Sequence, residues 1–159
     1  MNNQYSHEPD NYICPFCNFF AGNETDYNKK QDIVYQDESV TAFIAPTGWA
    51  NNLGHVLVVP TRHYENIYSI PDDELATVYK AVKKIAIAIR STYGCSGVST
   101  RQHNEPAGDQ DVWHLHVHVF PRYEDDELYS NHRQIESLGS ELRAPYAEKL
   151  QAYFAEHVE

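Results

Sequence analysis

Three histidines at two-residue spacing are the residues of this chain whose types and positions most clearly suggest chemistry. His114, His116 and His118 alternate with apolar residues in the segment 112–122, Val-Trp-His-Leu-His-Val-His-Val-Phe-Pro-Arg. Because successive strand side chains point to opposite faces, a strand here would place all three imidazoles on one face. Imidazole titrates near neutral pH, so the row can supply a nucleophile, a proton donor and a metal ligand. One such histidine would more often be incidental, but three in register favour a reactive face.

Cys14 and Cys17 form a second group of side chains that could do chemistry. A Cys-x-x-Cys pair can be a redox couple, half of a tetrahedral zinc site, or simply two buried thiols. The redox interpretation is disfavoured because no strand-to-helix pattern of the thioredoxin kind surrounds the pair. Zinc would need two more nitrogen or sulfur ligands, and the chain has nine histidines to provide them. The third cysteine, Cys95, is expected to be a small buried residue.

Composition limits the classes of function. The chain has 159 residues, of which 42% are hydrophobic and 13% aromatic, and this predicts one globular domain spanning residues 1–159. With 23 acidic and 12 basic side chains the formal charge is −11, which argues against nucleic-acid and membrane partners. No apolar run is long enough to span a membrane, and the polar start does not resemble a signal peptide. An odd number of cysteines fits a reducing compartment, so we expect a cytoplasmic protein.

The elements that must position these residues are strands of a mostly antiparallel sheet. Strand patterns occur in five segments, which are residues 33–35, 40–44, 55–59, 97–102 and the histidine segment. The first two predict a hairpin, and the last two predict a second hairpin across the loop 103–111. The run at 55–59 is apolar throughout, so it predicts a central strand buried on both faces and closed by Pro60.

Two helices complete the predicted architecture. Apolar residues recur every three or four positions from Leu75 to Ile89, after Pro71 and three acids, which predicts one long amphipathic helix. Pro145 is expected to begin a C-terminal helix, and the acidic stretch 124–127 to be a solvated loop. The predicted fold class is therefore α+β, with the long helix packed on the sheet.

In its motifs the sequence resembles the histidine triad (HIT) family, whose mark is His-x-His-x-His with apolar residues at x. Four more motifs occur in the family's order, and they are Cys14-Pro-Phe-Cys17, Gly54-His-Val-Leu-Val-Val-Pro60, His63 and Ala107-Gly-Asp-Gln110. The resemblance covers about residues 12–123, so 124–159 would be a C-terminal extension with a helix. The Pro121-Arg122 pair is similar to the hydrolase-like branches.

The resemblance implies an enzyme that acts at the α-phosphate of a nucleotide. His116 would form a covalent nucleotidyl-histidine intermediate, and His118 would donate a hydrogen bond to the phosphoryl or leaving-group oxygen. Dinucleoside polyphosphates are the expected substrates, and nucleoside phosphoramidates are the alternative. A nucleotide-binding or interaction module with little turnover, and a scaffold held by zinc, are alternatives of other classes.

The resemblance also implies which residues contact the nucleotide. The expected substrate-binding residues are Phe16, Phe43, His103, Asn104, Gln110 and Asp111. The two phenylalanines would line a slot for the base, although ordinary core packing explains them equally well. Asp111 departs from the Ser or Thr of many relatives, and an ionised carboxylate there would repel phosphate. Three explanations would avoid this repulsion: Asp111 is protonated, it orients a water or a cationic group, or the leaving group differs from that of other members.

For the cysteine pair, the resemblance implies that His63 and His114 complete a zinc site with Cys14 and Cys17. Four protein ligands would leave no open position, so the zinc would be structural and catalysis would need no cofactor. Family members pair through the long helix and an edge strand, so a homodimer is expected.

Overall fold

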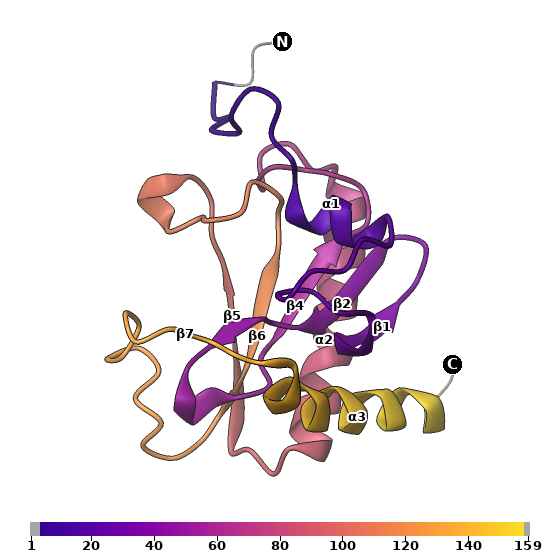
Figure 1. The fold of residues 1–159 in the computed structure, drawn as a ribbon, viewed down its shortest axis with the longest axis vertical. Coiled ribbons are helices and arrows are strands. Elements are labelled where there is room, and N and C mark those ends of the chain that lie inside the picture. Colours follow the sequence, from indigo (N-terminus) through magenta and orange to yellow (C-terminus); the bar gives the residue numbers. More distant parts are fainter. Residues whose placement is uncertain (1–3, 158–159) are drawn as a thin grey trace.

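The protein is described from a computed structural model, which covers residues 4–157. The predicted domain span of 1–159 thus includes residues 1–3 and 158–159, which lie outside the described residues. A five-stranded antiparallel sheet forms the centre (Figure 1). In spatial order its strands are β1 (Ile33–Gln36), β2 (Val40–Ile44), β4 (Val56–Pro60), β6 (Val117–Arg122) and β5 (Gly97–Gln102). The predicted α+β class is confirmed, and both hairpin pairings are present.

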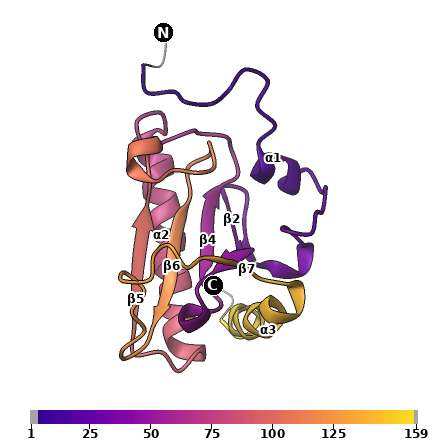
Figure 2. The ribbon, with the colours of Figure 1, turned by 60° about the vertical axis from the view of Figure 1, so that its left-hand side comes forward.

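The long helix α2 (Asp72–Thr92) packs against one face of this sheet (Figure 2). Its buried residues follow the predicted three-to-four spacing, and Val82, Ile85 and Ile89 belong to the same core as Val58 and Val117. Burial of such aliphatic side chains contributes about 1.5–3 kcal/mol each, so this interface stabilises the fold.

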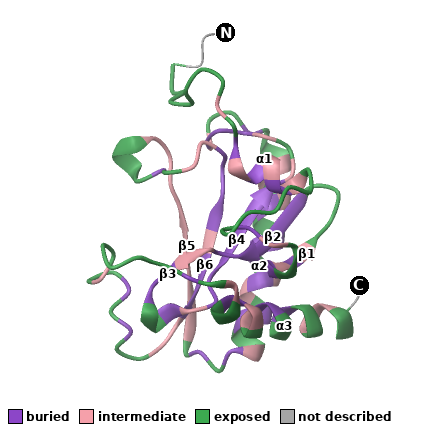
Figure 3. Cartoon of the chain, in the orientation of Figure 1, coloured by how far each residue is buried: buried purple, intermediate pink, exposed green. Residues whose placement is uncertain are grey.

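A short helix, α1 (Pro15–Phe20), contributes to the opposite face of the sheet. Phe16 and Phe19 pack there against Phe43 of β2 and Leu57 of β4. Strands β2 and β4 are therefore buried on both faces (Figure 3), which explains why the segment at 55–59 lacks polar alternation.

The remaining elements are short, apart from the C-terminal helix. They are β3 (Thr47–Gly48), β7 (Glu136–Ser137), α3 (Ser140–Glu156) and the 3₁₀ turns Lys30–Asp32, Ala50–Asn52 and Pro106–Gly108. Strands β3 and β7 pair as a separate two-stranded sheet. None of the helices in residues 4–157 is both long and apolar enough to cross a membrane.

The C-terminal helix begins at Ser140, so the prediction that Pro145 begins it was wrong. Pro145 lies inside the helix, where the lost backbone donor is tolerated because other contacts fix the first turns. Arg143 is 1% exposed, and its Nη2 lies 2.8 Å from Oδ2 of Asp32, the residue that ends a 3₁₀ turn. Its Nη1 donates to the carbonyl of Leu138 at 2.6 Å. A buried tertiary ion pair therefore holds the first turns of the helix in place, and local sequence does not reveal it.

The acidic stretch 124–127 was predicted to be a solvated loop, and this was wrong for Asp126, which is buried. Its Oδ2 accepts from Arg122 Nε at 2.7 Å and from Asn52 Nδ2 at 2.8 Å. The backbone N–H of Tyr123 donates to the same carboxylate. The Arg122 guanidinium, above all, holds the pKa of Asp126 well below its usual range, so the group is a structural anion.

Candidate functional site

The regular part of the histidine segment is shorter than predicted. Strand β6 begins at Val117, so His114 and His116 precede it. The strand does not extend further back because the backbone N–H of Leu115 donates to the carbonyl of Tyr64 and not to a neighbouring strand. The alternation nevertheless persists, since Leu115 and Val117 are fully buried in the core beneath α2. The triad histidines therefore lie on the opposite face, although only His118 belongs to the strand.

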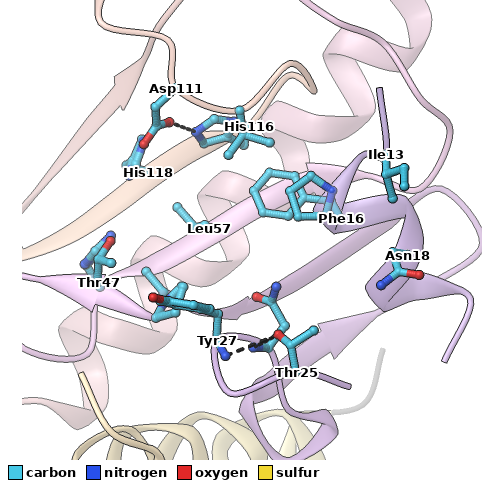
Figure 4. Close-up of a pocket in the computed structure, with 16 residues that line it drawn as sticks. Ile13, Phe16, Asn18, Thr25, Tyr27, Thr47, Leu57, Asp111, His116 and His118 are labelled. Carbon is cyan, nitrogen blue, oxygen red and sulfur yellow. Dashed lines mark hydrogen bonds and ion pairs between the residues drawn. The ribbon is translucent and has the colours of Figure 1, made fainter. Parts of the chain in front are cut away.

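That face contains a cavity of about 440 Å³. Asp111, His116 and His118 line one end, and Thr25 and Tyr27 line the other (Figure 4). The apolar Phe16 and Leu57 lie between these two ends, and the lining also includes Ala45 and Pro46. A ligand with a polar group, such as a phosphate, and a flat apolar ring would match this arrangement.

His116 has a defined tautomer. Its ring is 3% exposed, and Nδ1 lies 2.7 Å from the backbone carbonyl of His114, to which an Nδ1 hydrogen donates. Nε2 is then the nitrogen with the free lone pair, and it lies 3.8 Å from Oδ1 of Asp111. Burial lowers the pKa of His116 despite the opposing effects of the His114 carbonyl and of Asp111. A neutral imidazole with one available nitrogen is the form that can act as a nucleophile.

His118 is the neighbouring imidazole, with its ring centre 5.0 Å from that of His116. Its ring is parallel to that of Phe120, and the two are 5.6 Å apart. Burial lowers the pKa of His118 well below its usual value. The His118 ring is therefore neutral at pH 7. It can donate a hydrogen bond from one ring nitrogen, but it does not carry the positive charge of an imidazolium.

His55, which lines the same cavity, was not among the predicted site residues. Its ring stacks on Phe120 at 4.6 Å, and burial, reinforced by Arg101, lowers the pKa of His55 to about 3. The guanidinium of Arg101 lies 4.4 Å from the centre of the Phe120 ring, and within residues 4–157 its Nε and Nη2 have no hydrogen-bond partner. The sequence signal for His55 was its place after Gly54; for Arg101 there was none.

Only some of the predicted substrate-binding residues line the cavity. Phe16 and Asp111 line the cavity, whereas Phe43 is fully buried behind Phe16, with ring centres 5.6 Å apart. His103 lies beside His118, with ring centres 5.6 Å apart, and is outside the cavity lining.

Asn104 and Gln110 are used within the protein. The amide of Gln110 donates to the carbonyls of Glu65 and Val112 at 2.6 and 3.0 Å, and its oxygen accepts from the backbone of Glu105. Asn104 Oδ1 accepts from the backbone of Ile67 at 2.8 Å. These side chains hold the loop that carries Asp111 and do not line the cavity.

The four predicted metal-binding residues, Cys14, Cys17, His63 and His114, lie together, with all potential ligand atoms within 4.8 Å of one another. His114 Nδ1 is 3.3 Å from Cys14 Sγ, and His63 Nδ1 is 3.3 Å from Cys17 Sγ. Such separations suit a tetrahedral ion with bonds of about 2.0–2.3 Å to nitrogen and sulfur.

The outer contacts of the two histidines support the same interpretation. His114 Nε2 donates to the carbonyl of Pro60 at 2.9 Å, and His63 Nε2 donates to Glu8 Oε2 at 2.8 Å. Both Nδ1 lone pairs are thereby directed at the thiols, as metal-ligating imidazoles require. The donor set therefore fits a thiolate-binding metal ion.

Comparison with known proteins identifies the family. A HIT domain model matches residues 26–125, which is more than half of the chain. The chain belongs to the histidine triad family. A HIT-like protein of Methanocaldococcus jannaschii is 38% identical over 114 residues, covering 72% of this chain and 82% of that protein.

Solved structures agree with this assignment to the HIT family. A HIT-like protein from Bartonella henselae has a TM-score of 0.74 and 29% identity, covering 89% of this chain and 97% of that one. A histidine triad protein from Mycobacterium smegmatis, described as zinc-bound, has a TM-score of 0.73 and 24% identity, covering 90% and 94%.

Proposed function

We propose that this HIT protein hydrolyses or transfers nucleotides at the α-phosphate through a covalent intermediate on His116. The observation that carries the proposal is the 2.7 Å contact between His116 Nδ1 and the His114 carbonyl. It places the proton on Nδ1 and leaves the Nε2 lone pair at the wall of the cavity. Burial keeps that ring neutral, so the lone pair is available at pH 7.

The reaction would proceed in two displacements. In the first, Nε2 of His116 forms a bond to phosphorus while the bond from phosphorus to the leaving oxygen breaks, and that oxygen keeps the electron pair. An N–H of His118 would donate a hydrogen bond to the oxygen on which charge develops. In the second, water attacks phosphorus, the N–P bond breaks, and its electron pair returns to Nε2 while the proton of the water passes to solvent.

Dinucleoside polyphosphates are the proposed substrates, and nucleoside phosphoramidates are the alternative. An adenylylsulfatase of Arabidopsis thaliana is 27% identical over 118 residues, covering 74% of this chain and 56% of that protein. A diadenosine triphosphate hydrolase of Plasmodium falciparum shares the fold, with a TM-score of 0.69 and 13% identity. Asp111 favours a second candidate function, binding without turnover, because its carboxylate lies where the phosphate would react.

Turnover distinguishes these functions. The purified protein would be incubated with a diadenosine polyphosphate and with an adenosine phosphoramidate, and kcat/KM would be compared between them. We expect His116→Ala to lose at least about 10³-fold in kcat, and mass spectrometry of quenched wild-type reactions to show a nucleotidyl adduct. His132→Ala, which changes an exposed histidine, is the matched control. Undiminished turnover in His116→Ala would refute the mechanism, and an inactive wild type that still binds nucleotide would support the binding module.

We also propose that Cys14, Cys17, His63 and His114 hold a structural zinc ion, as the donor set indicates. Zinc would supply no chemistry to the reaction and would attach α1 to the sheet. Reduced thiols are consistent with the cytoplasmic location that we propose. Elemental analysis should find about one zinc per chain, and metal-free protein of full stability would refute the site.

A homodimer through α2 and the edge strand β5 is the proposed assembly. Ile87 of α2 is 48% exposed, and it lines a shallow apolar hollow with Ala86 and with Val98 of β5. Apolar side chains that gather in one open hollow suit an interface. Sedimentation should show a dimer that Ile87→Glu converts to monomer, whereas a monomeric wild type would refute this assembly.

A further inference from the structure

Asn28 is a buried polar side chain in the cavity that the proposed mechanism does not use. It lines the cavity, is 6% exposed, and follows Tyr27 in the sequence. Tyr27 and Thr25 lie at the end of the cavity away from His116. Its Oδ1 is buried, and within residues 4–157 no group donates a hydrogen bond to it. A buried acceptor without a donor costs about 1–3 kcal/mol, so such atoms are uncommon unless a ligand satisfies them.

The backbone around Asn28 is held in place, so the free acceptor is not the result of a loose segment. The N–H of Asn28 donates to Thr25 Oγ1 at 3.1 Å, and the N–H of Thr25 donates to the carbonyl of Asn28 at 3.0 Å. The nearby Asn18 also lines the cavity, but its Oδ1 accepts from Asn23 at 2.9 Å. Asn28 is therefore the cavity amide that is prepared to accept a hydrogen bond from a ligand.

The surroundings of Asn28 indicate the chemistry of that ligand. The apolar walls formed by Phe16 and Leu57 separate this end from the triad histidines (Figure 4). If the α-phosphate lies at His116, these walls contact the flat base of the nucleotide, and the far edge of the base reaches the end lined by Asn28. An exocyclic amino group on that edge is a hydrogen-bond donor, which is what Oδ1 needs.

We propose that Asn28 recognises the amino group of an adenine base, so that the protein prefers adenine nucleotides over analogues without this group. An amide presents an acceptor beside a donor, and adenine presents the complementary pair, the N6 amino group beside a ring nitrogen. The inference rests on the proposed function, because it assumes that the phosphate lies at His116. It goes beyond that function in assigning base selectivity to one side chain.

The test is a binding cycle with two nucleotides and two proteins. AMP and purine riboside 5′-monophosphate, which lacks the amino group, would be titrated by calorimetry into wild type and Asn28→Leu. We expect wild type to bind AMP about tenfold more tightly than the analogue, and the leucine variant to reduce this preference to less than about twofold. Asn51→Leu, which changes an exposed asparagine outside the cavity lining, should keep the tenfold preference.

Stability without nucleotide gives a second readout that separates recognition from a structural role. Leucine has nearly the shape of asparagine and removes the unpaired acceptor, so Asn28→Leu should melt at or above the wild-type temperature. A melting temperature lowered by more than about 5 °C in both Asn28→Leu and Asn28→Ala would mean that the side chain supports the fold and would overturn the inference. If the leucine variant does not fold, Asn28→Ala gives the same nucleotide comparison.

The remaining outcomes of the binding experiment also test the inference. Equal wild-type affinity for AMP and the analogue, or an unchanged preference in the variant, would overturn the inference. Asn28→Leu could instead change only the preference for AMP over 2′-deoxy- or 3′-deoxy-AMP. That result would mean that Oδ1 accepts from a ribose hydroxyl, and it would also overturn the inference. Because AMP binding needs no turnover, base selectivity can fail while nucleotide binding survives; a wild type that does not bind AMP would overturn both proposals.

Discussion

At the scale of single residues, the histidines of this protein differ in function because each ring has different neighbours. His114 donates through Nε2 to Pro60 and presents Nδ1 to the thiols, whereas His116 donates through Nδ1 and presents Nε2 to the cavity. His55 and His118 are buried against Phe120, and burial keeps both neutral. The side-chain type is the same throughout, and the acceptor opposite each ring nitrogen determines the role.

The low pKa of His55 predicts an acid-dependent loss of stability. Its pKa is about 3 in the folded protein and about 6.5 in the unfolded chain, so the unfolded state binds the proton first as pH falls. The contribution is intact above about pH 6.5 and is lost between about pH 6.5 and 3. Urea unfolding at about pH 7.5 and 5 should show a drop in wild type about 2 kcal/mol larger than in His55→Gln. Equal drops would show that His55 is not the buried neutral group described.

Asp111 predicts an electrostatic effect on phosphate binding. Its side chain is 81% exposed, and Oδ1 lies 3.8 Å from His116 Nε2, so an ionised carboxylate would repel a nucleotide phosphate at that nitrogen. Asp111→Asn should bind AMP about fivefold more tightly at low salt, with the gain shrinking as salt is added. Asp109→Asn removes a nearby charge that does not line the cavity and is the control. Weaker AMP binding in Asp111→Asn would instead show that the carboxylate assists binding.

At the scale of elements, the sequence predicted well wherever periodicity reports burial. The spacing of Leu75 to Ile89 predicted α2, and the apolar run ending at Pro60 predicted the central strand β4. The start of α3 was missed because Arg143 pairs with the distant Asp32. The burial of Asp126 was missed because its carboxylate also contacts Asn52, which is far away in the sequence. In the site, the triad histidines and the cysteine pair could be predicted from the chemistry of their side chains. The positions of Asn28 and His55 in the cavity lining could be recognised only from the structure.

The ion pair at the start of α3 predicts a large effect of a single substitution. Arg143 and Asp32 are each 1% exposed at their side chains. Arg143→Met would leave the Asp32 charge buried without its partner, so the free energy of unfolding should fall by about 3–5 kcal/mol. The double variant Arg143→Met with Asp32→Leu should recover much of this loss, because no buried charge remains. Denaturant unfolding measures both, and a single variant within about 1 kcal/mol of wild type would contradict this prediction.

At the scale of the whole molecule, the acidic protein presents a mainly neutral cavity. A formal charge of −11 would repel nucleotides in general, yet the cavity is lined chiefly by apolar and neutral polar groups, with Asp111 as its one carboxylate within the described residues. Nucleotide binding would therefore depend on local hydrogen bonds and ring packing, and association would be slowed by the overall charge.

Metal removal tests how the N-terminal segment is held to the rest of the molecule. Chelation should lower the melting temperature and increase hydrogen exchange in α1, because Cys14 and Cys17 lose their link to His63 and His114. Added zinc should restore both. Cys17→Ser should behave like chelated protein, whereas Cys95→Ser, at a buried cysteine outside the cluster, should keep its metal. Unchanged exchange in α1 after chelation would show that the cluster does not hold the segment.

One residue joins the cysteine cluster to His116, the proposed nucleophile. The side chain of His114 faces the thiols, while its carbonyl, four bonds from that ring, fixes the proton of His116. A shift of this peptide unit would allow that proton to move to Nε2, and the nitrogen that faces the cavity would then lack its lone pair. Damage to the cluster would therefore change the tautomer of His116. We expect this to lower kcat before it changes KM, and to alter the ¹⁵N chemical shifts of the His116 ring.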